Sequence, residues 1–415
     1  MPSPEIPAAE RPSLERPSLE RLHGLDALRG GALLLGVVLH AAMAYFPTQI
    51  WVYADSQTSP GASGLFFAIH LFRMTTFFLI AGLFAHMMLS RRGVVGFVRD
   101  RLIRIAGPLV GLWWLVFGAI VGVLIWLAAI ANGGTVPTNG PPPPPLTAET
   151  FPLTHLWFLW MLLIFYAVLL ILRAPFAALD KSGAWGRGVD RLTGALIGPW
   201  TPALMAAPLA LAFWLAPAWI PFFGIPTPDT GLVPNPVALT GFGTAFALGF
   251  LLDRRRDLLT RIAGLWPVFT VVGLIAGVGA LMLVGGPTPV LAPQADPALK
   301  AASAAAMAFA IQSVTFAVLS LSLRFASGHS AVRRYLADAS YWVYIVHLPL
   351  VMVGQVMLRD LDAPWWVKLA AVVVGVLTVS LGTYELLVRH TVMGRWLNGR
   401  RVPWRRSAPA LVPAE

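Results

Sequence analysis

The sequence contains no cysteine and few charged residues, and both absences exclude classes of protein. Without cysteine among its 415 residues, the chain has no disulfide framework, no thiolate nucleophile and no cysteine-based metal site. Only 12% of the residues are charged, against about 25% in soluble domains. A water-exposed globular fold is therefore excluded for most of the chain.

Long apolar runs recur along almost the whole sequence, in which 57% of the residues are hydrophobic. A run of about 18 or more apolar residues is typical of a membrane-spanning helix. We therefore predict an all-α, polytopic bundle of about ten transmembrane helices. The predicted spans are residues 27–46, 65–89, 105–131, 154–174, 195–219, 236–252, 262–284, 302–325, 340–358 and 365–388.

The positive charges favour one orientation of these spans. All but four of the 30 Lys and Arg residues lie in or beside the N-terminal segment, the C-terminal segment and the alternate loops on the same side. The exceptions are Arg73, inside a span, and Lys300, Arg359 and Lys368 on the other side. Since cytoplasmic loops are enriched in Lys and Arg, we expect both termini in the cytoplasm. Topology and anionic lipid then explain the net charge of +11 without a nucleic-acid partner.

The segments outside the spans are short. Residues 1–22 contain the near-repeat RPSLE and no apolar signal-peptide core, so we expect a disordered cytoplasmic tail. Residues 23–390 form the predicted membrane domain, and residues 391–415 a basic cytoplasmic tail, with no appended soluble domain. Five consecutive prolines at 141–145 predict polyproline II in an outer loop.

Ionisable side chains inside the predicted spans are candidates for function, because a charge at the bilayer centre costs roughly 2.5–3.5 kcal/mol on insertion scales. His70 and Arg73 share one face of the second span. Arg29 and His40 lie eleven residues apart, so they project from one helix face about 16 Å apart along the axis. An anchoring arginine with a hydrogen-bonded core histidine explains that spacing as well as a pair of functional residues does. Asp26 and Arg29 could also form a local ion pair.

Two further motifs each have a structural and a functional interpretation. Arg101 and Arg104, in RLIRIAGP, are ordinary positive flanking residues or ligands for phosphate groups. His155 and Trp157, in HLWFLW, belong to an interfacial aromatic belt or to a surface that binds a sugar ring.

The last two spans carry polar residues as well. SYWVYIVHLP places Tyr344 and His347 on one helix face. Glu385 and Arg389, four residues apart, are most simply a structural ion pair.

Taken in order, these motifs resemble acyltransferase family 3, a family of polytopic membrane acyltransferases. The resemblance rests on Arg29-x10-His40, on FFLIAGLF (77–84) with Ala81 where serine is usual, on RLIRIAGP (101–108) and on SYWVYIVHLP (340–349). It covers roughly residues 21–390. HLWFLW and the terminal YELLVRHTVMGRWLNG are similar to a subgroup, the glucan biosynthesis protein C-like enzymes, which are associated with succinylation of periplasmic glucans.

The resemblance implies a multi-pass enzyme of the bacterial inner membrane that transfers an acyl group, acetyl or succinyl, from cytoplasmic acyl-CoA to a hydroxyl of an extracytoplasmic glycan. His40 would be the catalytic base or would carry the acyl group, because an imidazole accepts a proton near neutral pH. Arg73 would stabilise the oxyanion. The other expected substrate-binding residues are Arg29, His70, Arg101, Arg104, His155, Trp157, Tyr344 and His347.

No metal ion and no permanently bound cofactor is expected, and acyl-CoA is the donor substrate. A backbone carbonyl, a tyrosine or an outer carboxylate such as Asp55 could orient His40. The acyl group, the acceptor and the oligomeric state stay open. The alternative is a transporter or exporter of a glycan or lipid, which would also place His and Arg within the membrane.

Overall fold

Helices make up most of the chain that the structure describes. The computed structural model describes residues 18–137, 142, 145–328 and 330–403. Within these residues there is no β-strand, and one isolated bridge joins Pro152 to Thr230, so the predicted all-α bundle is confirmed. The α-helices are α1 (Ser18–Ala42), α2 (Pro60–Arg101), α3 (Gly107–Ala131), α4 (Trp157–Leu179), α5 (Ala184–Leu196), α6 (Thr201–Leu215), α7 (Pro236–Arg254), α8 (Asp257–Gly264), α9 (Trp266–Leu283), α10 (Pro297–Phe325), α11 (Ala331–Met357), α12 (Trp365–Thr383) and α13 (Val392–Asn398).

Eight helical stretches of the described chain are long and apolar enough to cross a membrane. One of them, Pro60–Ala131, has 72 residues, and a straight helix of that length would exceed three bilayer cores. It is bent at Gly93, which has φ 66° and ψ −177°, so it holds the second and third predicted spans. The fifth predicted span falls on a break, because α5 and α6 meet at 102°. The count of ten stays a prediction.

The outer helices expose large apolar side chains. On α3, Val110 and Trp114 are 68% and 69% exposed, and on α9, Leu274 and Ile275 are 65% and 69% exposed. Side chains of this size on a water-facing surface would be unfavourable. A hydrocarbon environment explains them.

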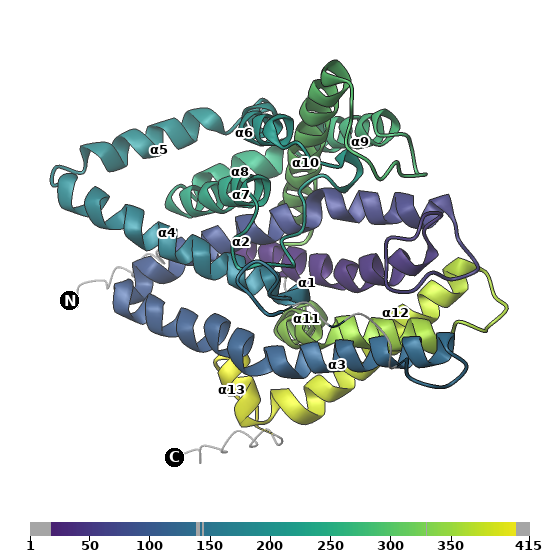
Figure 1. The fold of residues 1–415 in the computed structure, drawn as a ribbon. Coiled ribbons are helices and arrows are strands. Elements are labelled where there is room, and N and C mark those ends of the chain that lie inside the picture. The colour runs from purple at the N-terminus through teal and green to yellow at the C-terminus, as the bar shows by residue number, and fades with distance from the viewer. Residues whose placement is uncertain (1–17, 138–141, 143–144, 329, 404–415) are drawn as a thin grey trace, which may run out of the picture.

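Helices α1 and α2 lie side by side through the middle of the bundle (Figure 1). Helices α7 and α10 pack on one side of this pair, whereas α3, α11 and α12 lie on the other. Helix α11 contacts α1, α3 and α12. The residues between α1, α2, α4 and α11 are therefore surrounded by helices, and these four helices supply most of the site described below.

Two glycines allow α2 and α7 to pack closely. A Cβ atom at Gly82 would overlap the carbonyl oxygen of Phe246, and a Cβ atom at Gly249 would overlap the carbonyl oxygen of Leu79. Small residues at such a crossing let two backbones approach.

We expect Gly82→Val to destabilise the fold by about 3 kcal/mol, at the upper end of the usual effect of overpacking, because the overlap is with backbone. The yield of monodisperse protein in detergent and its midpoint of thermal unfolding should both fall. Gly122→Val is the matched control, since a Cβ atom there meets nothing within 4 Å. Equal behaviour of the two variants would contradict the importance of this crossing.

Three predictions concern residues beyond or at the edge of the described chain. Of the predicted tail 1–22, residues 1–17 lie outside the described residues, and α1 begins at Ser18. Of the five prolines, positions 141, 143 and 144 lie outside them too. In the predicted C-terminal tail, residues 392–398 form α13, and residues 404–415 are not described.

Candidate functional site

All ten residues that the sequence proposed for the site line a single cavity of about 670 Å³. They come from α1, α2, α4, α11, the π-helical segment Leu102–Ala106 and the 3₁₀ turn Thr154–Leu156. Their roles stay predictions, but the fold brings together side chains more than 300 positions apart in the sequence. The ten are Arg29, His40, His70, Arg73, Arg101, Arg104, His155, Trp157, Tyr344 and His347.

Arginines gather at one end of the cavity, which we call the basic end and define by Arg29, Arg101 and Arg104. Arg101 and Arg104 contact Asp100, at 2.8 and 3.3 Å. Asp100 is also paired with Arg92 at 3.1 Å. One buried carboxylate thus faces three guanidinium groups, and the local charge is positive.

Arg29 reaches the basic end from α1. Its Nη2 donates to the carbonyl oxygen of Ala337 at 3.3 Å and lies 3.5 Å from the carboxylate of Asp26. The predicted Asp26–Arg29 pair is therefore confirmed. Its Nε is buried and has no hydrogen-bond partner among the described residues.

Two prolines fix the site by leaving carbonyl oxygens free within helices. Proline has no N–H to donate to the carbonyl four residues earlier. Pro108 thereby frees the carbonyl of Arg104, which accepts a hydrogen bond of 2.6 Å from the hydroxyl of Tyr341. Pro349 frees the carbonyl of Ile345, which accepts a bond of 3.0 Å from His155 Nε2.

The hydrogen bond from His155 to Ile345 joins the motif HLWFLW to the motif SYWVYIVHLP, which are far apart in the sequence. The hydroxyl of Tyr344 also donates to the carbonyl of His155, at 2.7 Å. Thr154, just before this histidine, has a φ of 53° and is the one described non-glycine residue with positive φ. The turn is therefore held in an unusual conformation by α11.

Three imidazoles stand next to one another at mid-cavity. The ring centroids of His40 and His347 are 5.3 Å apart, and those of His155 and His347 are 5.0 Å apart. His70 lies apart from this row, stacked on Phe66 with centroids 5.0 Å apart. Among the described residues, no group of three or more His, Asp or Glu side chains could hold a metal ion.

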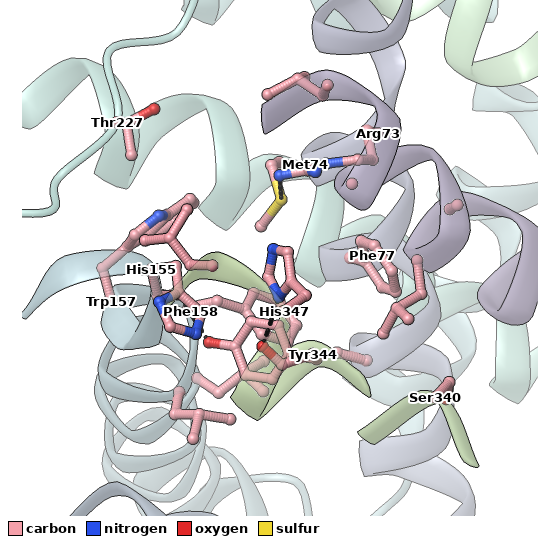
Figure 2. Close-up of a pocket in the computed structure, with 18 of the residues that line it drawn as sticks. Arg73, Met74, Phe77, His155, Trp157, Phe158, Thr227, Ser340, Tyr344 and His347 are labelled. Carbon is pink, nitrogen blue, oxygen red and sulfur yellow. Dashed lines mark hydrogen bonds between the residues drawn. The ribbon is translucent and has the colours of Figure 1, made fainter. Parts of the chain in front are cut away.

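Backbone carbonyls set the tautomers of two of these rings. His347 Nδ1 lies 2.7 Å from the carbonyl oxygen of Tyr344. Since a carbonyl only accepts, Nδ1 carries the hydrogen, and Nε2 has a free lone pair when the ring is neutral. Figure 2 shows this second nitrogen of His347 pointing into the cavity, toward Arg73 and Met74. In His155 the donor is Nε2, and Nδ1 is buried without a partner in the described chain.

His40 differs from both rings. Its side chain makes no hydrogen bond to a described residue, and its Nδ1 is buried. The suggestion that Asp55 orients His40 is wrong, because both carboxylate oxygens of Asp55 accept from Lys368 Nζ at 3.0 Å. The imidazole of His40 is therefore positioned by packing between His347 and Trp51.

Arg73 brings a positive charge to the same region. Its Nη2 lies 3.5 Å from the sulfur of Met74, its Nε is buried without a partner, and no carboxylate pairs with it in the described chain. It passes close to Gly36, where a Cβ atom would collide with Nη1. A guanidinium in this setting favours an anionic or partly anionic ligand.

Sequence reasoning missed Trp51 and Gln355. Trp51 lines the cavity, with its ring centroid 6.0 Å from that of His40. Gln355 is 1% exposed and bonds to Trp51 and to the backbone of His40. A tryptophan in a loop and a glutamine near the end of a helix carry no spacing signal. Pro108 and Pro349 did give a spacing signal, because each proline leaves the carbonyl four residues earlier without its helical hydrogen bond.

Two other polar groups lie away from the cavity lining. His86 pairs with buried Asp253 at 2.7 Å, joining α2 to α7. Arg389 pairs with Glu385 at 2.8 Å, which confirms the predicted structural ion pair. The first contact joins two helices and the second lies within one helical segment, so the arginines and histidines of the cavity remain the candidates for chemistry.

A helical bundle with apolar residues exposed around it, and with a cavity inside it that is lined in part by arginines and histidines, is a multi-pass membrane protein. The chain belongs to acyltransferase family 3, since the profile of that family, described as an acyltransferase domain, matches residues 22–385. It is therefore a membrane acyltransferase. No curated protein and no solved structure matches the chain.

Proposed function

We propose that this protein is an O-acyltransferase of the bacterial inner membrane. It would move an acetyl or succinyl group from cytoplasmic acyl-CoA to a hydroxyl of an extracytoplasmic glycan. The observation that carries the proposal is one continuous cavity with arginines at its basic end and three adjacent imidazoles at its middle. Such a cavity suits a donor and an acceptor that approach from opposite sides of the membrane.

The basic end suits the phosphates of acyl-CoA. Arg29, Arg101 and Arg104 present guanidinium groups there, and phosphate accepts bidentate hydrogen bonds from guanidinium. Asp100 already pairs with Arg92, so it keeps a partner when Arg101 and Arg104 turn to a ligand. From this end the pantetheine arm would run along the cavity toward His40, about 16 Å away.

The chemical step uses the imidazoles and Arg73. His40 removes the proton of the acceptor hydroxyl, the hydroxyl oxygen attacks the thioester carbonyl, and the carbon–sulfur bond breaks. The thiolate of CoA leaves and takes a proton, giving an ester and a thiol. Arg73 stabilises the oxyanion of the tetrahedral intermediate. In the covalent variant, a nitrogen of His40 attacks first and the acyl group passes from His40 to the hydroxyl.

Export of a glycan or lipid is the second candidate, because buried His and Arg also line transport pathways. Transfer and transport differ in the product. Purified protein in proteoliposomes, given acyl-labelled acetyl-CoA or succinyl-CoA and extracted cell-surface glycans, should form labelled glycan. Movement of unlabelled glycan without ester formation would favour the exporter.

We expect the double substitution of Arg101→Gln and Arg104→Gln to raise the KM for acyl-CoA at least tenfold with a smaller change in kcat. Charged hydrogen bonds contribute about 1.5–3 kcal/mol each, and about 1.4 kcal/mol is tenfold in affinity. The dependence of KM on salt should also weaken. Steady-state kinetics in nanodiscs at two salt concentrations measure both effects.

The matched control replaces Arg187 and Arg191 with glutamine. Both lie on α5, and neither lines the cavity. If the two double variants change KM equally, the loss reflects general charge and the docking assignment is wrong.

A further inference from the structure

The loop between residues 46 and 59 joins α1 to α2 and reaches the cavity through Trp51. The indole of Trp51 is half-buried and lies beside the imidazole of His40, with ring centroids 6.0 Å apart. On the other side of His40 stands His347. A loop residue therefore completes the surroundings of the proposed catalytic ring.

A single buried amide ties this indole to the backbone of His40. Trp51 Nε1 donates to Gln355 Oε1 at 3.0 Å, while Gln355 Nε2 donates to the carbonyls of His40 and Ala41 at 3.1 and 3.2 Å. An indole N–H only donates and a carbonyl only accepts. Rotating the amide by half a turn would lose all three bonds, so Gln355 fixes Trp51 relative to the end of α1.

A fully buried ion pair holds the same loop further along. Lys368 on α12 is 0% exposed and Asp55 is 1% exposed at their side chains, with Nζ 3.0 Å from both carboxylate oxygens. Asp55 also accepts from the hydroxyl of Tyr53 at 3.1 Å and from the backbone N–H of Gln57 at 2.9 Å. Burial and the neighbouring carboxylate raise the pKa of Tyr53, so its phenol stays protonated and donates.

This pair fixes a conformation more than it adds stability. A buried ion pair loses hydration that its attraction only partly offsets, so replacing it with apolar residues is often neutral. The pair instead holds the loop in one position, because the described groups that donate to the carboxylate of Asp55 lie on α12 or in the loop itself. The backbone N–H of Asp55 adds a bond of 2.8 Å to the carbonyl of Ala44.

We propose that Trp51, positioned by Gln355 and by the Asp55–Lys368 pair, determines nucleophile specificity by excluding water from the thioester beside His40. The inference rests on the proposed function. A base that activates an alcohol also activates water, which would attack the thioester carbonyl, break the carbon–sulfur bond and release the free acid and CoA. A bulky apolar ring beside the base leaves room for a positioned acceptor but restricts random access of water.

The test compares acyl-CoA hydrolysis with acyl transfer in nanodiscs. Acyl-labelled acetyl-CoA and succinyl-CoA are supplied with and without extracted cell-surface glycans, and free acid and labelled glycan are counted separately. Trp51→Ala should raise the ratio of hydrolysis to transfer at least tenfold. Val52→Ala is the control, because the neighbouring valine is 45% exposed and does not line the cavity.

The ion pair is tested by removing both charges at once. The double substitution Asp55→Leu and Lys368→Met leaves no unpaired buried charge, so its thermal stability should stay near that of the unmodified protein. Its ratio of hydrolysis to transfer should nevertheless rise as in Trp51→Ala. A purely structural role predicts that the ratio changes only when stability falls, and Asp55→Asn alone provides that destabilised comparison.

A measurement that does not depend on catalysis tests this inference independently of the proposed function. Diethyl pyrocarbonate modifies exposed imidazoles, and peptide mass spectrometry reports the fraction of His40 that reacts. Labelling of His40 should rise severalfold in Trp51→Ala and in the double variant. If the unmodified enzyme transfers acyl groups but neither the ratio nor the labelling changes in the variants, water exclusion by Trp51 is wrong. If labelling rises while no protein forms labelled glycan or free acid, the shielding is right and the proposed function is wrong.

Discussion

His40→Ala is expected to reduce kcat/KM for acyl transfer by about 10²–10⁴-fold, the contribution of a positioned general base. The unbonded imidazole of His40 stands between His347 and Trp51 in the only part of the described cavity where three histidines meet. Two described carboxylates line the cavity, Asp229 and Asp338, and neither forms a hydrogen bond with His40. The KM for acyl-CoA should change little, because the basic end is unaltered. Single-turnover and steady-state kinetics with labelled acyl-CoA measure the loss.

His86→Ala is the matched control, because His86 lies outside the cavity lining and pairs with Asp253. It should lower thermal stability and leave transfer per folded molecule within about threefold, since it removes only a helix contact. Equal activity of His40→Ala and the unmodified protein would overturn the assignment of the base.

His347 allows the role of His40 to be resolved further. With Nδ1 bonded to a carbonyl, His347 presents Nε2 to the cavity, so it is the better oriented of the two rings. If the rings act as one unit, the effects of His40→Ala and His347→Ala will be far from additive in a double-mutant cycle. Acid quenching followed by mass spectrometry would detect acyl-His40 if the covalent route operates.

The fold class, and the set of polar residues that line the cavity, could be predicted from the sequence for separate physical reasons. Apolar runs of spanning length dictate helices, because a backbone in lipid must satisfy its own hydrogen bonds. Ionisable residues inside those runs are unfavourable in lipid, so they must converge on a shared polar interior. That is why Arg73, His347 and the other proposed residues line one cavity although they lie on different helices.

What the sequence could not predict depends on contacts between distant segments. The bend of 102° between α5 and α6 lies at the start of the fifth predicted span, and α6 ends at Leu215, before the end of that span. The pairing of Asp55 with Lys368 joins residues 313 positions apart, and composition assigns neither a partner. The hydrogen bond from His155 to Ile345 follows from Pro349 only once the turn Thr154–Leu156 and α11 are known to be neighbours.

Arg73→Met is expected to lower kcat by about 10²–10³-fold, the usual effect of removing one donor to an oxyanion, and to raise the midpoint of thermal unfolding. The reason for both lies in the same observation. Arg73 has a buried Nε without a partner and contacts the sulfur of Met74, with no described carboxylate beside it. An ionised group buried without a counter-ion opposes folding, whereas methionine fills similar space with apolar atoms.

Arg73→Lys separates charge from geometry in this prediction. Lysine keeps the positive charge but lacks the planar guanidinium, so we expect intermediate activity and no gain in thermal stability. The KM for acyl-CoA should be similar in all three proteins, because Arg73 lies away from the basic end. A more stable but inactive Arg73→Met variant would mean that the fold accepts an unfavourable charge because catalysis needs it. A less stable variant with full activity would mean instead that Arg73 only supports the packing of α1 against α2 at Gly36.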